Sequence, residues 1–230
     1  MKDQPTDPVT GRLPRRLSER GLDESRTPVV YKAAVADARA TILKELAEGR
    51  HKTSAVTVAL VDDQHVLWAE AFGAIDQTQG LVPTTETLFC MASCSKIVAA
   101  VATMILVDRR LIELDAPLVR YVTAFRMADG EAYGDITVRM LLNHSSGLHG
   151  THFPNVLTVV PVAGYAAQLR EALANERLKH APGEMAVYCN DGFTLIELLI
   201  AAVTGKPYTD FVEQAILRPL GMHHSRFALI

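Results

Sequence analysis

The sequence lacks any long hydrophobic run. Nowhere do about 18 apolar residues follow one another without a charge, so we expect no transmembrane helix. Residues 1–30 mix charges with prolines and have no apolar segment of the kind that a secretory signal carries. The three cysteines, Cys90, Cys94 and Cys189, are odd in number and do not form a disulfide framework. Together these absences favour a reduced, cytoplasmic location.

An excess of charge of either sign is also missing. The chain has 23 Lys and Arg residues against 26 Asp and Glu residues, a net charge of −3. Such a balance gives no long-range field that would gather nucleic acid or an anionic membrane, so we expect neither as a partner. The composition, with 49% hydrophobic and 21% charged residues, is typical of a globular protein with a substantial core.

The patterns along the chain predict a flexible N-terminal arm at residues 1–30 and one domain at 31–230. A helix and a β-hairpin are expected at 31–88, and a mainly helical part at 89–230. Apolar residues recur at helical spacing in the first helix, and two β-branched, apolar segments flank a turn in the hairpin at 54–72. The stripe of the first helix comprises Val35, Ala38, Ile42 and Leu46.

The second part begins with a segment at 93–107 that is apolar almost all round, which predicts a buried helix. Further helices are expected near 138–143, 165–179, 192–203 and 208–217.

An S-x-x-K tetrad, Ser93-Cys94-Ser95-Lys96, opens the apolar helix. Residues three apart share a helix face, so the Lys96 amine can reach the Ser93 hydroxyl. The N–H groups and partial positive charge of a helix N-terminus suit a developing oxyanion. About one such tetrad is expected by chance in a chain of this length. The alternative is therefore a capping serine beside a lysine whose head reaches solvent.

A second pair, Tyr188 and Asn190, lies in a loop just before a predicted helix. Residues two apart on extended backbone point the same way, so a phenol and an amide can serve one site. The alternative is a buried tyrosine with a helix-starting asparagine. Between tetrad and pair, the sequence DITVRMLLNHSSGLHG predicts a short helix and a Ser-Ser-Gly turn, with no chemistry that its residues imply.

Two other groups of residues carry less weight. His144, His149 and His152 match no common zinc-ligand spacing, so we expect no metal and no cofactor. Cys94 and Cys189 adjoin the tetrad serine and the tyrosine. Adjacent helix residues diverge by about 100° and no histidine base is implied nearby, so inert thiols are expected.

Five ordered segments resemble class C β-lactamases and related penicillin-binding-protein-like serine hydrolases, which include D-alanyl-D-alanine carboxypeptidases, family VIII esterases and D-aminopeptidases. The segments are FCMASCSK, ITVRMLLNHSSGL, PGEMAVYCNDGF, VTGKPY and RPLGM. The resemblance runs from about Lys52 to the end of the chain. It implies an α/β fold of the α+β type, in which an antiparallel sheet is flanked by helices and joined to a mainly helical subdomain.

The resemblance also implies roles for four residues. Ser93 would attack a carbonyl and form an acyl-enzyme, with its own backbone N–H as one oxyanion donor. Lys96 and Tyr188 would act as bases, and which of the two takes the serine proton stays open. Asn190 would bind the substrate amide or hold Lys96. The implied enzyme is a hydrolase of a small acyl substrate: a β-lactam, an ester or a D-amino-acid amide.

One expected motif has no match. Such enzymes carry a third motif, K-T-G, H-x-G or W-x-G, on a later strand, whereas this sequence ends at GMHHSRFALI, and its Thr204-Gly205-Lys206 has the wrong order. We therefore expect only the N-terminal portion of the fold, without the C-terminal strands, and an unpaired apolar edge on the hairpin. The alternative function is an incomplete fragment or pseudoenzyme that binds a ligand or a complementary C-terminal chain or segment without turnover.

Overall fold

The structure is a computed structural model that describes residues 29–49, 51–63, 65–128, 130–151, 162 and 164–227. The arm predicted at 1–30 lies outside these residues, except that the first helix already begins at Val29. The chain divides into two compact units, Met1–Phe89 and Cys90–Ile230, and each is described by itself.

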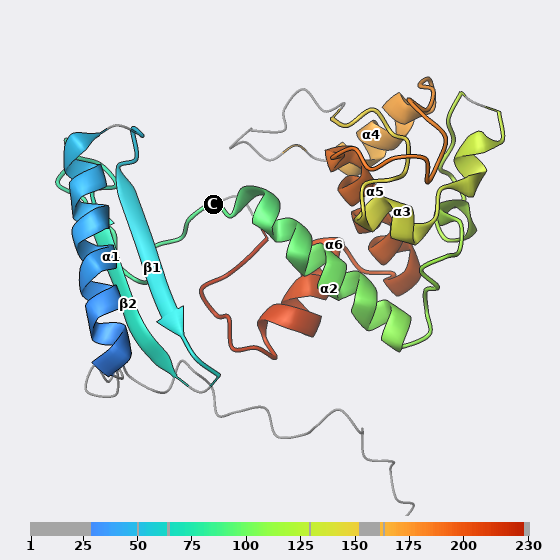
Figure 1. Cartoon of the computed structure of the whole chain (residues 1–230). Coiled ribbons are helices and arrows are strands. Elements are labelled where there is room, and N and C mark those ends of the chain that lie inside the picture. The colour runs from blue at the N-terminus through green and yellow to red at the C-terminus, as the bar shows by residue number, and fades with distance from the viewer. Residues whose placement is uncertain are drawn as a thin grey trace, which may run out of the picture. The chain divides into compact units, whose positions relative to one another are not determined.

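The first unit is one helix against a two-stranded hairpin (Figure 1). Helix α1 (Val29–Glu48) packs on β2 (Val66–Gly73), which pairs with β1 (Ala55–Val61). The half-buried positions of α1 include the whole predicted apolar stripe, so its sequence periodicity identified the face that packs. An ion pair of 2.6 Å joins Arg39 Nη2 on α1 to Glu70 Oε2 on β2.

The hairpin is antiparallel, as predicted, with Ala55 opposite Gly73 and Leu60 opposite Trp68. Trp68 and Phe72 are buried, and their rings meet edge to face with centroids 6.4 Å apart. Within the described residues the sheet has these two strands alone, so the outer edges of the hairpin have no strand partner there.

The second unit is helical and centred on α5 (Asn190–Thr204), which packs against all the other α-helices of the unit (Figure 1). These are α2 (Ser95–Asp108), α3 (Val138–Leu142), α4 (Tyr165–Leu173) and α6 (Tyr208–Val212), the last continuing into a π-helical turn at Glu213–Leu217. All four predicted helical segments are present. The helix expected to reach residue 179 ends at Leu173.

Helix α2 differs from its prediction in two ways. It begins at Ser95, because Ala92–Cys94 forms a separate 3-10 turn in front of it. It is also buried along one side only, where it packs on α5 and α6. The buried side chains are Ala99, Ala102, Thr103 and Leu106, and the exposed ones include Ile97, Val101 and Met104. Apolar composition all round the helix therefore did not predict burial all round.

None of the helices in the described ranges combines the length and the apolar character that crossing a bilayer requires. The cytoplasmic location stays a prediction of the sequence.

A buried polar contact links α4 to α5. The Tyr165 hydroxyl donates a hydrogen bond to the Glu197 carboxylate. Burial raises the pKa of Glu197 to about 6, although the hydrogen bond from Tyr165 opposes that shift. The Glu197 carboxyl group is therefore more easily protonated in the folded than in the unfolded chain. Burial first, and the nearby Glu197 charge second, also raise the pKa of Tyr208.

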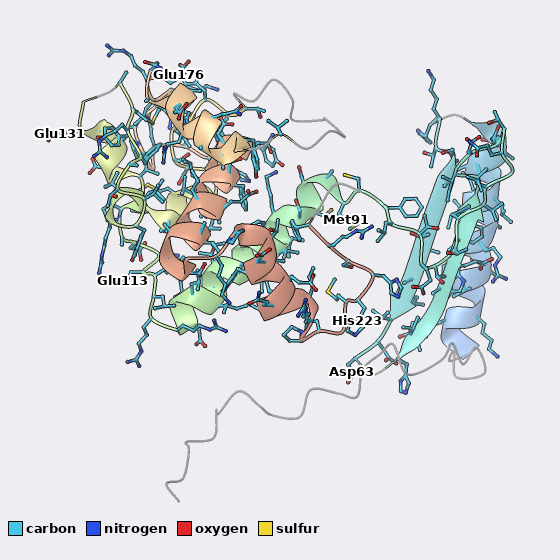
Figure 2. All side chains as sticks on the ribbon, turned by 180° about the vertical axis from the view of Figure 1, so that it is seen from behind. Asp63, Met91, Glu113, Glu131, Glu176 and His223 are labelled. Atoms are coloured by element: carbon cyan, nitrogen blue, oxygen red, sulfur yellow. The ribbon has the colours of Figure 1, made fainter. Side chains whose placement is uncertain are left out.

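Replacing Glu197 with glutamine tests this burial. A raised folded-state pKa contributes stability that is present below the ordinary value of 4.5 and is lost as pH rises through about 6. The unfolding free energy of Glu197→Gln minus that of the wild type should therefore rise by about 2 kcal/mol from pH 4 to pH 7.5. Urea unfolding at both pH values measures this rise. Glu131→Gln, at an exposed position (Figure 2), is the control, and an equal offset at both pH values would contradict the prediction.

Candidate active site

Ser93 lies in the 3-10 turn Ala92–Cys94, which leads directly into α2. The Cys94 N–H donates to the Met91 carbonyl oxygen at 3.0 Å, and Ala92 has a φ of +43°, a conformation that costs energy for a residue other than glycine. The turn leaves Ser93 exposed, two residues after Met91, which Figure 2 labels, and places Lys96 in the first turn of α2.

The four residues singled out in the sequence come together at this turn. Lys96 Nζ lies 3.2 Å from Ser93 Oγ and 2.7 Å from Asn190 Oδ1. The Tyr188 hydroxyl lies 2.7 Å from Ser93 Oγ. Residues separated by more than 90 positions in the chain thus form one hydrogen-bonded group, with Ser93 Oγ between an amine and a phenol.

The contacts of Lys96 influence the pKa of the neighbouring phenol. The Tyr188 hydroxyl has a pKa below the ordinary value of 10. Its hydrogen bond with Lys96 is the largest cause, and its hydrogen bond with Ser93 is the second. Lys96 Nζ also lies 4.9 Å from the ring centroid of Tyr188 and 5.5 Å from that of Phe193, within the range of cation–π attraction. The arrangement favours loss of the phenol proton next to the serine hydroxyl.

A loop that the sequence did not mark as functional holds Asn190 in place. The Gly150 carbonyl accepts hydrogen bonds from the backbone N–H groups of Asn190 at 2.8 Å and Asp191 at 3.0 Å. The Asn190 side-chain amide donates to Thr151 Oγ1 at 2.9 Å. Because the amide nitrogen is engaged by Thr151, the amide oxygen is turned toward Lys96. No spacing rule links Thr151 to Asn190, so sequence patterns had no signal for this contact.

The neighbouring thiol Cys189 is poorly suited to nucleophilic chemistry. It is buried at the N-terminus of α5, where its sulfur accepts a hydrogen bond from the Gly192 N–H at 3.4 Å. Burial raises the pKa of its thiol, which disfavours the reactive thiolate.

The other sequence candidates stay outside the hydrogen-bonded group of four. Thr204 is the last residue of α5 and Gly205 caps it, while Lys206 follows the helix and its Nζ donates to Gln214 Oε1 at 2.6 Å. Of the three clustered histidines, His152 lies outside the described residues, so the absence of a metal stays a prediction. His144 contacts the tyrosine and is treated below.

Comparison with known proteins identifies the family of the chain. The family model named Beta-lactamase matches residues 33–229. The chain belongs to the beta-lactamase family. It is 28% identical over 176 residues to penicillin-binding protein 4 of Amycolatopsis lactamdurans, covering 76% of this chain and 45% of that protein. It is 30% identical over 174 residues to esterase EstB of Burkholderia gladioli, covering 70% and 44%.

Solved structures agree on the fold. The octameric penicillin-binding protein homologue of Pyrococcus abyssi matches with a TM-score of 0.72 and 27% identity, over 82% of this chain and 43% of that one. A class C beta-lactamase in complex with cefoxitin matches with a TM-score of 0.72 and 24% identity, over 91% and 53%. These matches confirm the resemblance to the family and the predicted fold class. The chain spans about half the length of these structures and less than half of the curated relatives.

The contact between Thr151 and Asn190 can be tested by Thr151→Val, which removes the hydroxyl oxygen but keeps the side-chain shape. One lost hydrogen bond is worth about 0.5–1.5 kcal/mol, so the turned amide should hold Lys96 less well, and a fluorophosphonate should label Ser93 about two- to tenfold more slowly. Thr151→Ser keeps the oxygen and should restore the rate. Unchanged labelling of Thr151→Val, with an unchanged melting temperature, would contradict this role.

Proposed function

We propose that the chain carries the nucleophile and bases of a serine hydrolase that works through an acyl-enzyme on Ser93. The observation that carries the proposal is the position of Ser93 Oγ, 2.7 Å from the Tyr188 hydroxyl and 3.2 Å from Lys96 Nζ. A nucleophile within hydrogen-bond reach of its base, with that base oriented by a third group, is the arrangement that activates a serine.

Tyr188 fits the role of the base better than Lys96 does. The amine of Lys96 donates to Asn190 Oδ1 as well as to Ser93 Oγ, as a cation would. Hydrogen bonds with Lys96 first and Ser93 second lower the pKa of Tyr188, which makes the phenolate accessible nearer to neutral pH. The phenolate takes the hydroxyl proton of Ser93 while Oγ forms a bond to the carbonyl carbon of the substrate.

The remaining steps use the same groups. The Ser93 backbone N–H, in the 3-10 turn in front of α2, donates to the oxyanion of the tetrahedral intermediate. Tyr188 then gives its proton to the leaving oxygen or nitrogen as the bond from the carbonyl carbon breaks. In deacylation Tyr188 takes a proton from water, the hydroxide attacks the acyl carbon, and the proton returns to Ser93 Oγ as the ester bond breaks.

The substrate class stays among three candidates: a β-lactam, an ester or a D-amino-acid amide. The names of the similar proteins cover the same range, since they include penicillin-binding proteins, an esterase and a D-amino acid amidase. The exposure of Ser93 and Tyr188 is compatible with each of these acyl groups.

The alternative is a chain that binds an acyl ligand, or a complementary C-terminal segment, without turnover. It concerns this chain alone, which spans 43% and 53% of the two solved structures compared above. The two candidates differ in whether the acyl group leaves the serine.

Intact-mass spectrometry after incubation with a fluorescent penicillin, a fluorophosphonate or p-nitrophenyl acetate tests the proposal. One adduct is expected on the wild type and none on Ser93→Ala, because the hydroxyl is the acyl acceptor. Ser54→Ala, an exposed serine in the other unit, should label as the wild type does. An adduct that survives Ser93→Ala would sink the proposal, whereas a Ser93 ester that never hydrolyses would favour the alternative.

The role of Tyr188 predicts a pH dependence. The acylation rate should rise with pH toward a plateau whose midpoint lies below 10, because phenolate accumulates as pH approaches the lowered pKa. Tyr188→Phe should lower the rate by about 10²–10⁴-fold and remove this rise. Tyr133→Phe, which keeps the edge-to-face contact with Phe125, is the matched control. Stopped-flow acylation from pH 5 to pH 10 measures both effects, and a Tyr188→Phe profile equal to that of the wild type would refute the assignment.

A further inference from the structure

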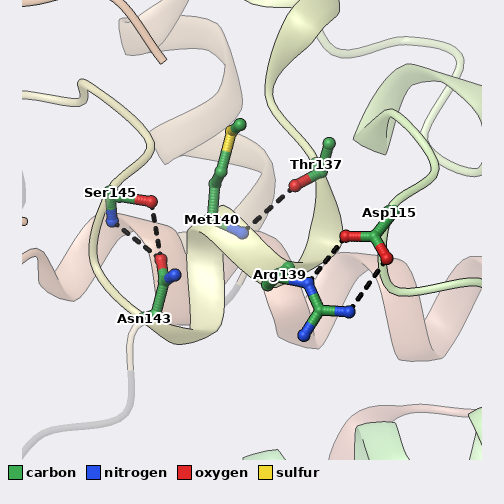
Figure 3. Close-up of polar contacts among 6 residues, drawn as sticks. All are labelled: Asp115, Thr137, Arg139, Met140, Asn143 and Ser145. Carbon is green, nitrogen blue, oxygen red and sulfur yellow. Dashed lines mark hydrogen bonds and ion pairs between the residues drawn. The ribbon is translucent and has the colours of Figure 1, made fainter. Parts of the chain in front are cut away.

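His144 occupies a strained position two residues after the last residue of α3, Leu142. Its φ of +65° lies in the left-handed region, which costs a residue other than glycine about 1 kcal/mol. The side chain of the preceding residue closes a turn around it: Asn143 Oδ1 accepts hydrogen bonds from Ser145 N–H at 3.1 Å and from Ser145 Oγ at 2.7 Å (Figure 3). The backbone of His144 is thus held in place on both sides.

The helix in front of His144 is itself anchored. Thr137 Oγ1 accepts a hydrogen bond from the Met140 N–H at 3.2 Å and caps the start of α3 (Figure 3). Arg139 forms a two-pronged ion pair with Asp115, with distances of 2.6 and 2.9 Å. The helix that precedes the turn at His144 is therefore held by a cap at its start and by an ion pair with Asp115.

From this position His144 binds both neighbours of Tyr188. Its carbonyl oxygen accepts from the Val187 N–H at 2.9 Å, and its ring Nδ1 accepts from the Cys189 N–H at 3.0 Å. The imidazole also stacks on the Tyr188 ring, with centroids 4.6 Å apart and planes at 36°. Three contacts thus fix the backbone and the ring of the residue whose hydroxyl reaches Ser93.

The hydrogen bond from Cys189 requires a neutral imidazole. Nδ1 accepts only when it carries no proton, so the ring proton resides on Nε2. Protonation would set an N–H on Nδ1 against the Cys189 N–H and add a second positive charge near Lys96. Burial first, and the charge of Lys96 second, hold the pKa of His144 below its ordinary value of 6.5. The titratable residues that interact with the His144 ring are Lys96, Tyr188 and Cys189. Asp191 follows in the first turn of α5, and Arg139 on α3 is paired with Asp115.

We propose that His144, as the neutral imidazole, is a positioning residue that holds Tyr188 against Ser93, and that its protonation releases Tyr188 and slows acylation at acidic pH. The part that concerns acylation rests on the proposed function. The part that concerns the position of Tyr188 does not, because it can be measured on the phenol itself.

Two substitutions separate the contacts. His144→Phe keeps an aromatic ring against Tyr188 but loses the Nδ1 acceptor. His144→Asn offers an amide oxygen near the place of Nδ1, tolerates the left-handed backbone and does not titrate. His223→Asn, at an exposed histidine (Figure 2), is the control, and melting temperatures show whether each variant folds.

The first measurement follows tyrosinate absorbance near 295 nm against pH, with the curve of Tyr188→Phe subtracted to isolate Tyr188. In the wild type and in His223→Asn, Tyr188 should titrate below 10. In His144→Phe its midpoint should move up toward 10, because a released phenol loses its contacts with Lys96 and Ser93. This readout needs no substrate, so it stands even if Ser93 proves unreactive.

The second measurement is the acylation rate of Ser93 between pH 4.5 and pH 8. In the wild type the slope of log rate against pH should steepen from about 1 to about 2 below the pKa of His144, because two groups must then lose a proton. In His144→Asn the slope should stay near 1 throughout. A Tyr188 titration unchanged in His144→Phe, or a steepened slope retained in His144→Asn, would overturn the proposal, whereas an unreactive wild-type serine would refute only the proposed function.

Discussion

The pairing of loop 144–151 with the segment that leads into α5 is the constraint on which the site depends. Backbone N–H groups of that segment donate to this loop in the pairs Lys179 to Gly147, Gly183 to Ser145, Val187 to His144 and Asn190 to Gly150. Gly147 makes the approach feasible, because its φ is +83° and a Cβ there would lie 2.3 Å from the His180 carbonyl oxygen. Without this pairing, nothing in the local sequence would turn Tyr188 toward Ser93.

Lys96 interacts with each of the other groups of the site. Lys96 donates to Ser93 and Asn190. A hydrogen bond with Lys96 is the main cause of the lowered pKa of Tyr188, to which the charge of Lys96 adds. Burial first, and the charge of Lys96 second, lower the pKa of His144. For the phenol this favours the charged form, since a cation attracts the phenolate. For the imidazole it favours the neutral form, since a cation repels the imidazolium. The same charge therefore supports a reactive tyrosine and an uncharged histidine beside it.

Helix α5 connects this chemistry to the core. Its first residue is Asn190, while Leu195, Leu199 and Ile200 farther along are fully buried against the other helices of the unit. The amide of Asn190 is therefore carried by the most enclosed element of the unit, which limits its motion relative to α2. Burial of a functional group's supporting helix is how a small polar cluster keeps hydrogen-bond geometry in an exposed position.

The sequence by itself determined whatever depends on local periodicity. Helical spacing put Ser93 beside Lys96 and marked the buried stripe of α1, and alternation along extended backbone allowed Tyr188 and Asn190 to serve one site. Only the tertiary structure decided which face of α2 is covered and that the two pairs meet. It also decided that His144 and Thr151 support them, since these contacts join segments about 40 to 95 positions apart. Such contacts depend on how the chain folds back on itself, and no repeating pattern in the sequence encodes them.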